Sequence, residues 1–163
     1  MTYIEDLSEY TYAHSAYYRP ITKAVGWLSR DHTFRSVRPT DELLDLIWQY
    51  CKFPVARMRG SHDCEFCSPN LSTARDLPSL LAGLEQARNH RRVERNGETM
   101  MLGSAEIRAF GKNGLVYAAP NLIYHYISVH HYGPPNEFLE ALWSEPRPPD
   151  PNYSSLLKEL DLA

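Results

Sequence analysis

Residues 91–118, RRVERNGETMMLGSAEIRAFGKNGLVYA, carry the pattern that decides the fold. Two turn signals divide this stretch, the pair Asn96-Gly97 and the Gly-Lys-Asn-Gly run at 111–114. An Asn-Gly pair is favoured in tight β-hairpins, because both of its positions adopt a positive φ. Segments with strand character lie on either side of each turn, and the longest is expected over residues 99–110. The stretch therefore predicts an antiparallel meander. A further strand is expected over residues 53–58.

Helical patterns flank this meander on both sides. The clearest runs from Pro39 to Cys51, where Thr40 is placed to cap the N-terminus and apolar residues recur at helical spacing. Further helices are expected over residues 77–88, 120–131, 136–143 and 154–160. Helices around a meander of three to five strands give an α+β fold.

The length of 163 residues suits one folding unit. We expect residues 1–145 to form a single α+β domain with a Tyr-rich N-terminal arm. Residues 146–163 are expected to form a Pro-rich extended segment and a short C-terminal helix, because prolines crowd the beginning of this segment.

The N-terminal arm is marked by its tyrosines, which are Tyr3, Tyr10, Tyr12, Tyr17 and Tyr18. Tyrosine offers a large contact area at low entropic cost, which suits recognition surfaces. Two interpretations follow: the rings pack over the core, or they bind a protein partner.

The formal charge of -3 and the pI of about 6.1 argue against broad binding to nucleic acids or anionic membranes. The basic run Arg88–Arg95 is either a solvated helix end or a nucleic-acid patch. No apolar run approaches the length of a membrane span, and the first residues show no basic segment followed by an apolar one. A cytoplasmic location is therefore expected.

The hexapeptide His62-Asp63-Cys64-Glu65-Phe66-Cys67 carries the chemistry of the chain. Two thiolates separated by two residues can bind one tetrahedral zinc ion. The third cysteine, Cys51, ends a helical pattern and is expected to be a buried thiol. An odd number of cysteines, with no export signal, argues against a disulfide scaffold. The alternatives to zinc are a pair of reduced thiols or a redox dithiol.

Four histidines are candidates to complete a zinc site, namely His62 and, on the predicted helix, His125, His130 and His131. His62 shares a face with Cys64 on an extended segment, while His125 and His130 lie on the predicted helix 120–131. On an ideal helix, residues five apart differ by about 140°, so His125 and His130 meet at one ion only if the last turn is distorted. The favoured set is therefore His62, Cys64, Cys67 and one helix histidine, with His125 ahead of His130. A structural ion is favoured over a catalytic one.

Glu106 is the candidate catalytic residue. Strand alternation places it on one face with Ser104 and Arg108, and this face is either solvated or close to the ion. In the second case Glu106 is a general base for zinc-bound water. Two functions follow: a binding or interaction module with structural zinc, such as an immunity-type protein that neutralises a partner, or a zinc-dependent hydrolase.

Several motifs resemble an uncharacterised family of small bacterial proteins. They are Gly60-x-His62-x-Cys64-x-x-Cys67, the run Gly103–Arg108, and His125-Tyr126 followed by His130, Tyr132, Pro134-Pro135 and Glu137-Phe138. The resemblance reaches to about Trp143 and implies one domain. It implies no particular activity.

Overall fold

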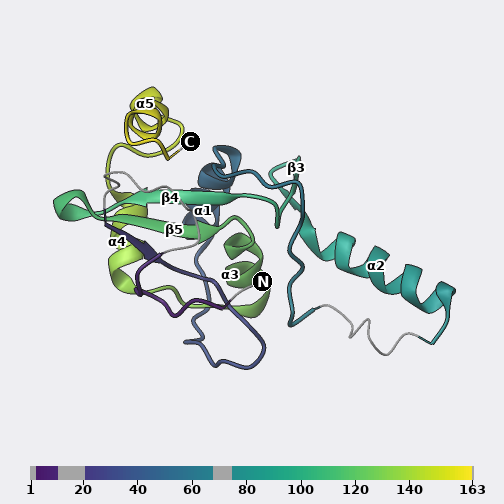
Figure 1. Cartoon of the computed structure of the whole chain (residues 1–163). Coiled ribbons are helices and arrows are strands. Elements are labelled where there is room, and N and C mark those ends of the chain that lie inside the picture. The colour runs from purple at the N-terminus through teal and green to yellow at the C-terminus, as the bar shows by residue number, and fades with distance from the viewer. Residues whose placement is uncertain (1–2, 11–20, 68–74, 163) are drawn as a thin grey trace.

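The computed structural model describes residues 3–10, 21–67 and 75–162. Within these residues, helices surround two small β-sheets (Figure 1), so the predicted α+β class is confirmed. None of the helices in these ranges combines the length and apolar character needed to cross a membrane.

The central sheet has the strand order β1-β5-β4. Strands β4 (Glu106–Phe110) and β5 (Val116–Pro120) pair antiparallel, and β1 (Thr22–Ala24) joins β5 in parallel. Every residue of β4 and β5 is buried, because elements on both faces cover them. The predicted turn at 111–114 joins the two strands, and Asn113 and Gly114 adopt positive φ there.

The second sheet is the predicted hairpin, formed by β2 (Arg92–Arg95) and β3 (Glu98–Met101). Asn96 and Gly97 have φ values of 51° and 76°, as an Asn-Gly hairpin turn requires. The long strand expected over 99–110 is interrupted between β3 and β4. Gly103 adopts a φ of 90° within that break, so the meander is divided between two sheets.

Helices α1 (Asp41–Lys52), α4 (Asn136–Trp143) and α5 (Pro151–Glu159) pack around the central sheet. The side chain of Thr40 accepts a hydrogen bond from the backbone N–H of Leu43, as expected of the cap. Helix α4 has the predicted bounds, and α5 begins three residues before its predicted start. Tyr153 and Leu157 of α5 are buried in the core.

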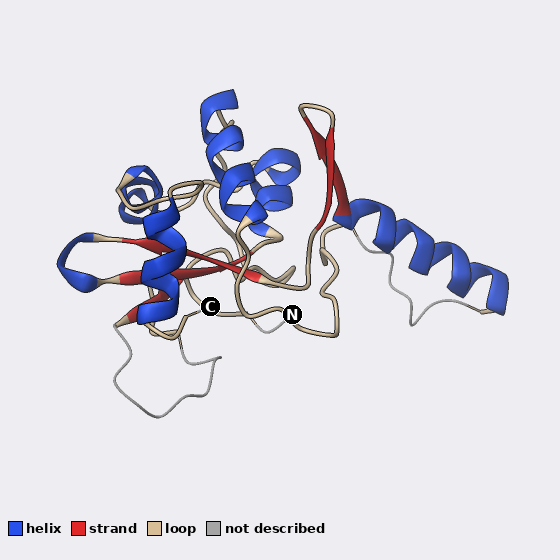
Figure 2. Ribbon diagram, turned by 90° about the horizontal axis from the view of Figure 1, so that it is seen from above, coloured by secondary structure: helices blue, strands red, loops and turns tan. Residues whose placement is uncertain are grey.

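Helix α2 (Leu77–Arg91) projects from the body of the protein, as Figures 1 and 2 show from two directions. Asp76 caps its N-terminus by accepting from the N–H of Ser79. The helix carries four exposed leucines on one stripe, at the i, i+3, i+4 and i+7 positions of Leu77, Leu80, Leu81 and Leu84.

Two local predictions are wrong. The strand expected over 53–58 is reduced to one bridge between Val55 and Glu106, and Ala56 departs from strand geometry with a φ of 47°. Pro120 was expected to begin a helix, but it is the last residue of β5 and pairs with Glu106. Helix α3 (Ile123–His130) therefore begins three residues later.

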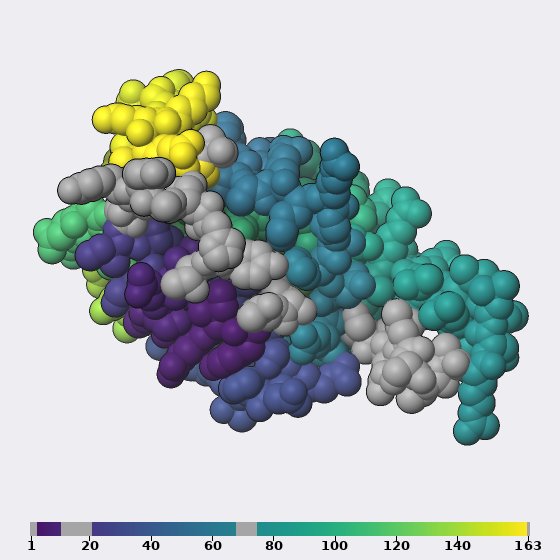
Figure 3. Space-filling model, viewed as in Figure 1, coloured from purple at the N-terminus to yellow at the C-terminus, as the bar shows by residue number. Residues whose placement is uncertain are grey.

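The described part of the N-terminal arm, residues 3–10, lies against β1 and the segment that follows it, and Figure 3 shows this part of the arm, in dark purple, on the surface of the body. Ile4 bridges Trp27, and the ring of Tyr3 stacks on His32 at a centroid distance of 3.6 Å. The hydroxyl of Tyr10 donates to Glu106 over 2.7 Å. These two tyrosines pack on the body of the protein, whereas Tyr12, Tyr17 and Tyr18 lie outside the described residues.

Candidate metal centre

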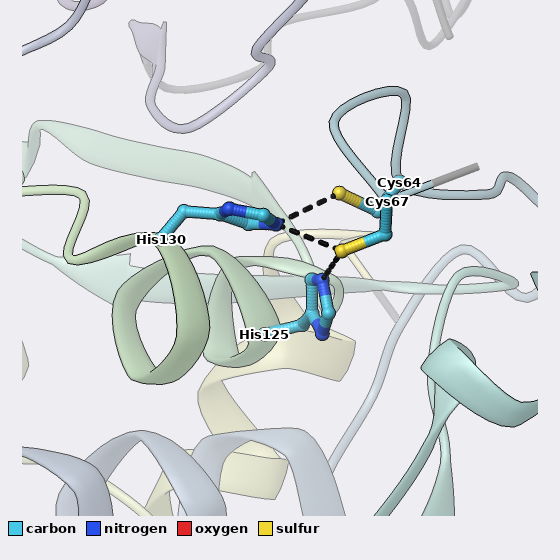
Figure 4. Close-up of side chains that lie close together, drawn as sticks. All are labelled: Cys64, Cys67, His125 and His130. Atoms are coloured by element: carbon cyan, nitrogen blue, oxygen red, sulfur yellow. Dashed lines mark hydrogen bonds between the residues drawn. The ribbon is translucent and has the colours of Figure 1, made fainter. Parts of the chain in front are cut away.

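Four side chains from two distant segments meet beside α3. Cys64 and Cys67 come from the loop before α2, and His125 and His130 come from α3 (Figure 4). One ligand atom from each residue lies within 4.8 Å of every other. Sγ of Cys67 is 3.3 Å from Nε2 of His125 and 3.1 Å from Nε2 of His130, and Sγ of Cys64 is 3.2 Å from Nε2 of His130.

These separations fit one tetrahedral ion. Zinc–sulfur and zinc–nitrogen bonds of about 2.3 and 2.0–2.1 Å place sulfur and nitrogen about 3.6 Å apart and two imidazole centroids about 5.2 Å apart. The sulfur–nitrogen distances are a few tenths of an ångström shorter, and the centroids of His125 and His130 are 5.1 Å apart. A small expansion of the group is enough to admit the ion.

The cysteine loop is shaped by its own backbone. The N–H of Cys67 donates to the carbonyl of Cys64 over 3.2 Å, which closes the turn between the two thiols. The amides of Cys67 and Phe66 also interact with the Cys64 sulfur and favour its thiolate form. The N–H of His62 donates to the carbonyl of Gly103 over 2.7 Å, so the loop is attached to the break between β3 and β4.

The end of α3 has the distortion that the two histidines require. His131 adopts the left-handed conformation and donates its N–H to the carbonyl of Tyr126, five residues back. The N–H of Tyr132 donates to the same carbonyl over 3.0 Å. An i→i−5 bond widens the turn beyond the α-helical pitch. The widened turn brings His130 onto the same side as His125.

The predicted ligand set therefore differs from the assembled one. The structure brings together Cys64, Cys67, His125 and His130, and it leaves His62 outside this group. The preference for His62 assumed an ideal helix, in which only one of the two α3 histidines reaches the ion. The widened turn removes that restriction.

Burial influences the protonation of three of the four candidate ligands. It raises the pKa of the Cys64 thiol to about 12. It lowers the pKa of the His125 imidazole to about 4, and the nearby imidazoles of His130 and His90 make a smaller contribution in the same direction. Burial also lowers the pKa of His130. The imidazoles are thus neutral at pH 7 and have lone pairs for an ion, whereas Cys64 must lose a proton when metal binds.

An aromatic wall covers one side of the four ligands. The ring of Phe66 lies 5.2 Å from the ring of His130 and 6.0 Å from that of Tyr126, and it contacts Phe34 edge-on at 5.5 Å. Phe66 lies between the two cysteines in sequence, so the loop brings its own apolar cover to the site. Apolar surroundings limit the access of water to a metal centre.

Glu106 is buried rather than solvated, with 2% of its surface exposed. Its Oε2 pairs with Arg108 over 2.7 Å, and its Oε1 accepts from Tyr10. Arg108 is equally buried and lies over the Tyr10 ring. Glu106 is not a member of the four-residue group. Its contacts hold the N-terminal arm on β4.

Cys51 is also separate from the group. It is buried in α1, and its thiol donates to the carbonyl of Asn121 over 3.5 Å. Burial raises the pKa of this thiol, so it stays protonated at neutral pH. These contacts are those of the buried thiol that the sequence predicts.

Residues at the base of α2 were missed by the sequence argument. Arg91 forms an ion pair with Asp63 over 2.7 Å, and the ring of His90 lies 6.4 Å from that of His125. Both were interpreted as parts of a basic run. Nothing in the local pattern relates α2 to the cysteine loop. The one available signal is Asp63, a carboxylate next to Cys64 for which a basic partner can be expected.

Residues 2–143 match the model of a family described as a domain of unknown function (DUF7919). The chain belongs to this family. All four candidate ligand residues of this DUF7919 chain lie within the matched range, as do α2 and the Glu106–Arg108 pair. Searches of curated proteins and of solved structures find no match.

Proposed function

We propose that this DUF7919 protein binds one zinc ion through Cys64, Cys67, His125 and His130. The observation that carries the proposal is that these four ligand atoms lie within 4.8 Å of one another. The cysteines precede α2 and the β2–β3 hairpin in the sequence, whereas the histidines follow them. Two thiolates and two imidazoles in a tetrahedral arrangement select zinc among the common divalent ions.

The ion has a structural role in this proposal. Four protein groups complete a tetrahedral zinc site and leave no open position for a water nucleophile. Cys64 and His125 are almost fully buried, with 1% and 3% of their surfaces exposed. The ion would join the cysteine loop to α3 and so hold together regions that the central sheet alone does not connect. The thiolates favour a reducing compartment such as the cytoplasm.

The biological role that fits a structural ion is binding to another protein, as in an immunity-type module. Residues 1–145 would act as one domain in this role, with the Tyr-rich arm as the contact surface. Tyr3 and Tyr10 already pack on the body, so a partner would recognise the arm in its folded position.

The hydrolase alternative has no supporting observation among the described residues. The proposed general base, Glu106, has its carboxylate oxygens in contact with Arg108 and Tyr10, and it does not belong to the four-residue group. The structural role is therefore the proposal that we retain.

Elemental analysis of purified protein tests the proposal. We expect one zinc per chain in the wild type and in Cys51→Ala, which removes the buried cysteine outside the group. We expect Cys64→Ser and His130→Ala to bind less than a tenth of that amount. Wild-type protein without zinc after purification with zinc supplementation, or full zinc content in both ligand variants, would refute the assignment.

A further inference from the structure

The base of α2 contacts the metal centre through a histidine outside the ligand group. His90 occupies the last turn of α2, and its ring lies 6.4 Å from the ring of His125 with the planes tilted by 40°. Two imidazoles on one tetrahedral ion would have centroids about 5.2 Å apart. His90 is therefore too far from His125 to share the ion in this arrangement, but it is an immediate neighbour of a ligand.

His90 has an unused hydrogen-bonding atom. Its Nδ1 is buried and has no hydrogen-bond partner among the described residues. Such atoms are rare in folded proteins, because a buried polar atom without a partner loses its hydration without compensation. An unpaired nitrogen beside a ligand imidazole points to a role that involves this ligand.

The ring of His125 can supply the matching hydrogen-bond donor. Its Nε2 faces Cys67, so Nδ1 carries the proton when the ion is bound. A metal-bound histidine ordinarily donates this second N–H to an acceptor, which fixes the ring. The hydrogen bonds of the described residues include none from Nδ1 of His125. Nδ1 of His90 can act as the acceptor when it carries no proton, and it is reached through a small ring movement or one bridging water.

A second contact joins the same turn of α2 to the cysteine loop. Arg91 pairs with Asp63, the residue before Cys64, and both side chains are largely covered. The backbone carbonyl of Arg91 also accepts from Leu102 over 2.9 Å, next to the Gly103 carbonyl that holds His62. The last turn of α2 thus contacts both halves of the metal centre, whereas the rest of the helix projects away from the body (Figure 1).

We propose that His90 is a positioning residue of the metal centre: it orients His125 toward the ion and makes the placement of α2 depend on metal occupancy. The inference rests on the proposed zinc site and assigns a consequence to it. The stripe of exposed leucines on α2 would then be presented in a fixed direction only by the zinc-loaded protein.

The test uses full-length protein loaded with Co²⁺ or Zn²⁺. His90→Ala is expected to bind one equivalent of metal, with affinity lowered about 10- to 100-fold and an altered Co²⁺ ligand-field spectrum. His90→Gln, which keeps an acceptor, is expected to recover part of both. Asn89→Ala, at an exposed position on the same turn, serves as the matched control and is expected to match the wild type.

Hydrogen exchange followed by mass spectrometry supplies the second measurement. Chelation is expected to raise exchange in the last turn of α2 in the wild type, and His90→Ala is expected to reduce the protection that zinc gives this turn. Wild-type affinity and spectrum in His90→Ala, together with α2 exchange that ignores zinc, would overturn the inference while leaving the zinc site intact. A wild-type protein that binds no metal would refute the zinc site itself.

Discussion

The backbone N–H of His131 donates to the carbonyl oxygen of Tyr126, five residues earlier, at the end of α3. This bond widens the last turn and decides which imidazoles meet the cysteines. In an α-helical turn, His125 and His130 would diverge by about 140°. Here both direct Nε2 toward the sulfur of Cys67. The metal centre therefore depends on a backbone feature outside its own ligands.

Changes at His131 should separate backbone geometry from side-chain chemistry. His131 has a φ of 56°, which glycine adopts freely and a β-branched residue does not. We expect His131→Gly to keep full zinc affinity and His131→Val to lose affinity by at least about tenfold. A tenfold loss of affinity corresponds to about 1.4 kcal/mol of binding free energy. Competition with a chromophoric chelator measures both. Equal affinities would show that the left-handed residue is not needed to place His130.

Removal of zinc should lower thermal stability. At a free zinc concentration 1,000 times the dissociation constant, binding stabilises the native state by about 4.1 kcal/mol. For a chain of this size, one kcal/mol corresponds to roughly 2–4 °C, so chelation should lower the melting midpoint by about 10 °C. Calorimetry with and without chelator tests this. Cys64→Ser should melt at the lower temperature in both conditions, and a chelator effect of equal size in this variant would contradict the prediction.

The stability of the metal-free protein should fall as the pH drops below about 6.5. Burial lowers the folded-state pKa of His125 to about 4, and it lowers that of His130 in the same direction. The unfolded chain therefore binds protons first, and the contribution of His125 is complete above pH 6.5 and lost as the pH falls toward 4. A shift from 6.5 to about 4 is worth on the order of 3 kcal/mol.

Urea unfolding of chelated protein at pH 7.5 and pH 4.5 measures this dependence. Other groups titrate in the same interval, so the informative quantity is the difference between the wild type and His125→Asn. This difference should be larger at pH 7.5 than at pH 4.5. The same difference at both pH values would indicate that the imidazole is not held neutral by the fold.

Glu106→Gln should destabilise the protein without releasing zinc. The substitution leaves the buried guanidinium of Arg108 without its carboxylate partner, a change that costs about 3–5 kcal/mol in buried ion pairs. Chemical unfolding and elemental analysis measure the two quantities. Glu140→Gln is the matched control, because the Glu140–Lys112 pair is exposed and contributes about 1 kcal/mol at most. Zinc loss from folded Glu106→Gln protein would instead place this carboxylate in the metal centre.

Gly103→Ala should damage the cysteine loop. A Cβ atom at this position would lie 2.3 Å from the carbonyl oxygen of His62, and the φ of 90° is unfavourable for alanine. We expect lower stability and weaker zinc binding, because His62 and the cysteines that follow must shift. Gly97→Ala is a useful comparison, since its φ of 76° gives similar backbone strain but no atom lies within 4 Å. Equal zinc affinity in the two variants would argue against the contact at Gly103.

The parts that the sequence predicts are those set by local chemistry. The hairpin follows from Asn96-Gly97 and the start of α1 from Thr40, because each turn or cap is made by nearby residues. The ligand types also follow from the pattern. The position of His62 outside the group does not follow from the pattern, because it depends on the hydrogen bond from His131 to Tyr126.

Long-range bonds explain the other differences. The N–H of Gly103 donates to the side chain of Asn121 over 2.7 Å, and the N–H of Asn121 donates to the carbonyl of Ala105. These bonds connect the break after β3 to the end of β5. They divide the expected strand 99–110 and delay the start of α3 beyond Pro120. No spacing in the sequence reveals bonds between residues so far apart.

The distance along the chain between the two ligand pairs has a consequence for synthesis. His125 follows Cys67 by 58 residues, so at 5–20 residues per second a ribosome adds it about 3–12 s later. During that interval the nascent chain carries the dithiol without the two α3 imidazoles of the proposed site. In the proposed site the ion can gain its full set of ligands only after α3 has emerged, and until then an oxidant or a competing thiophilic ion can reach the cysteines first.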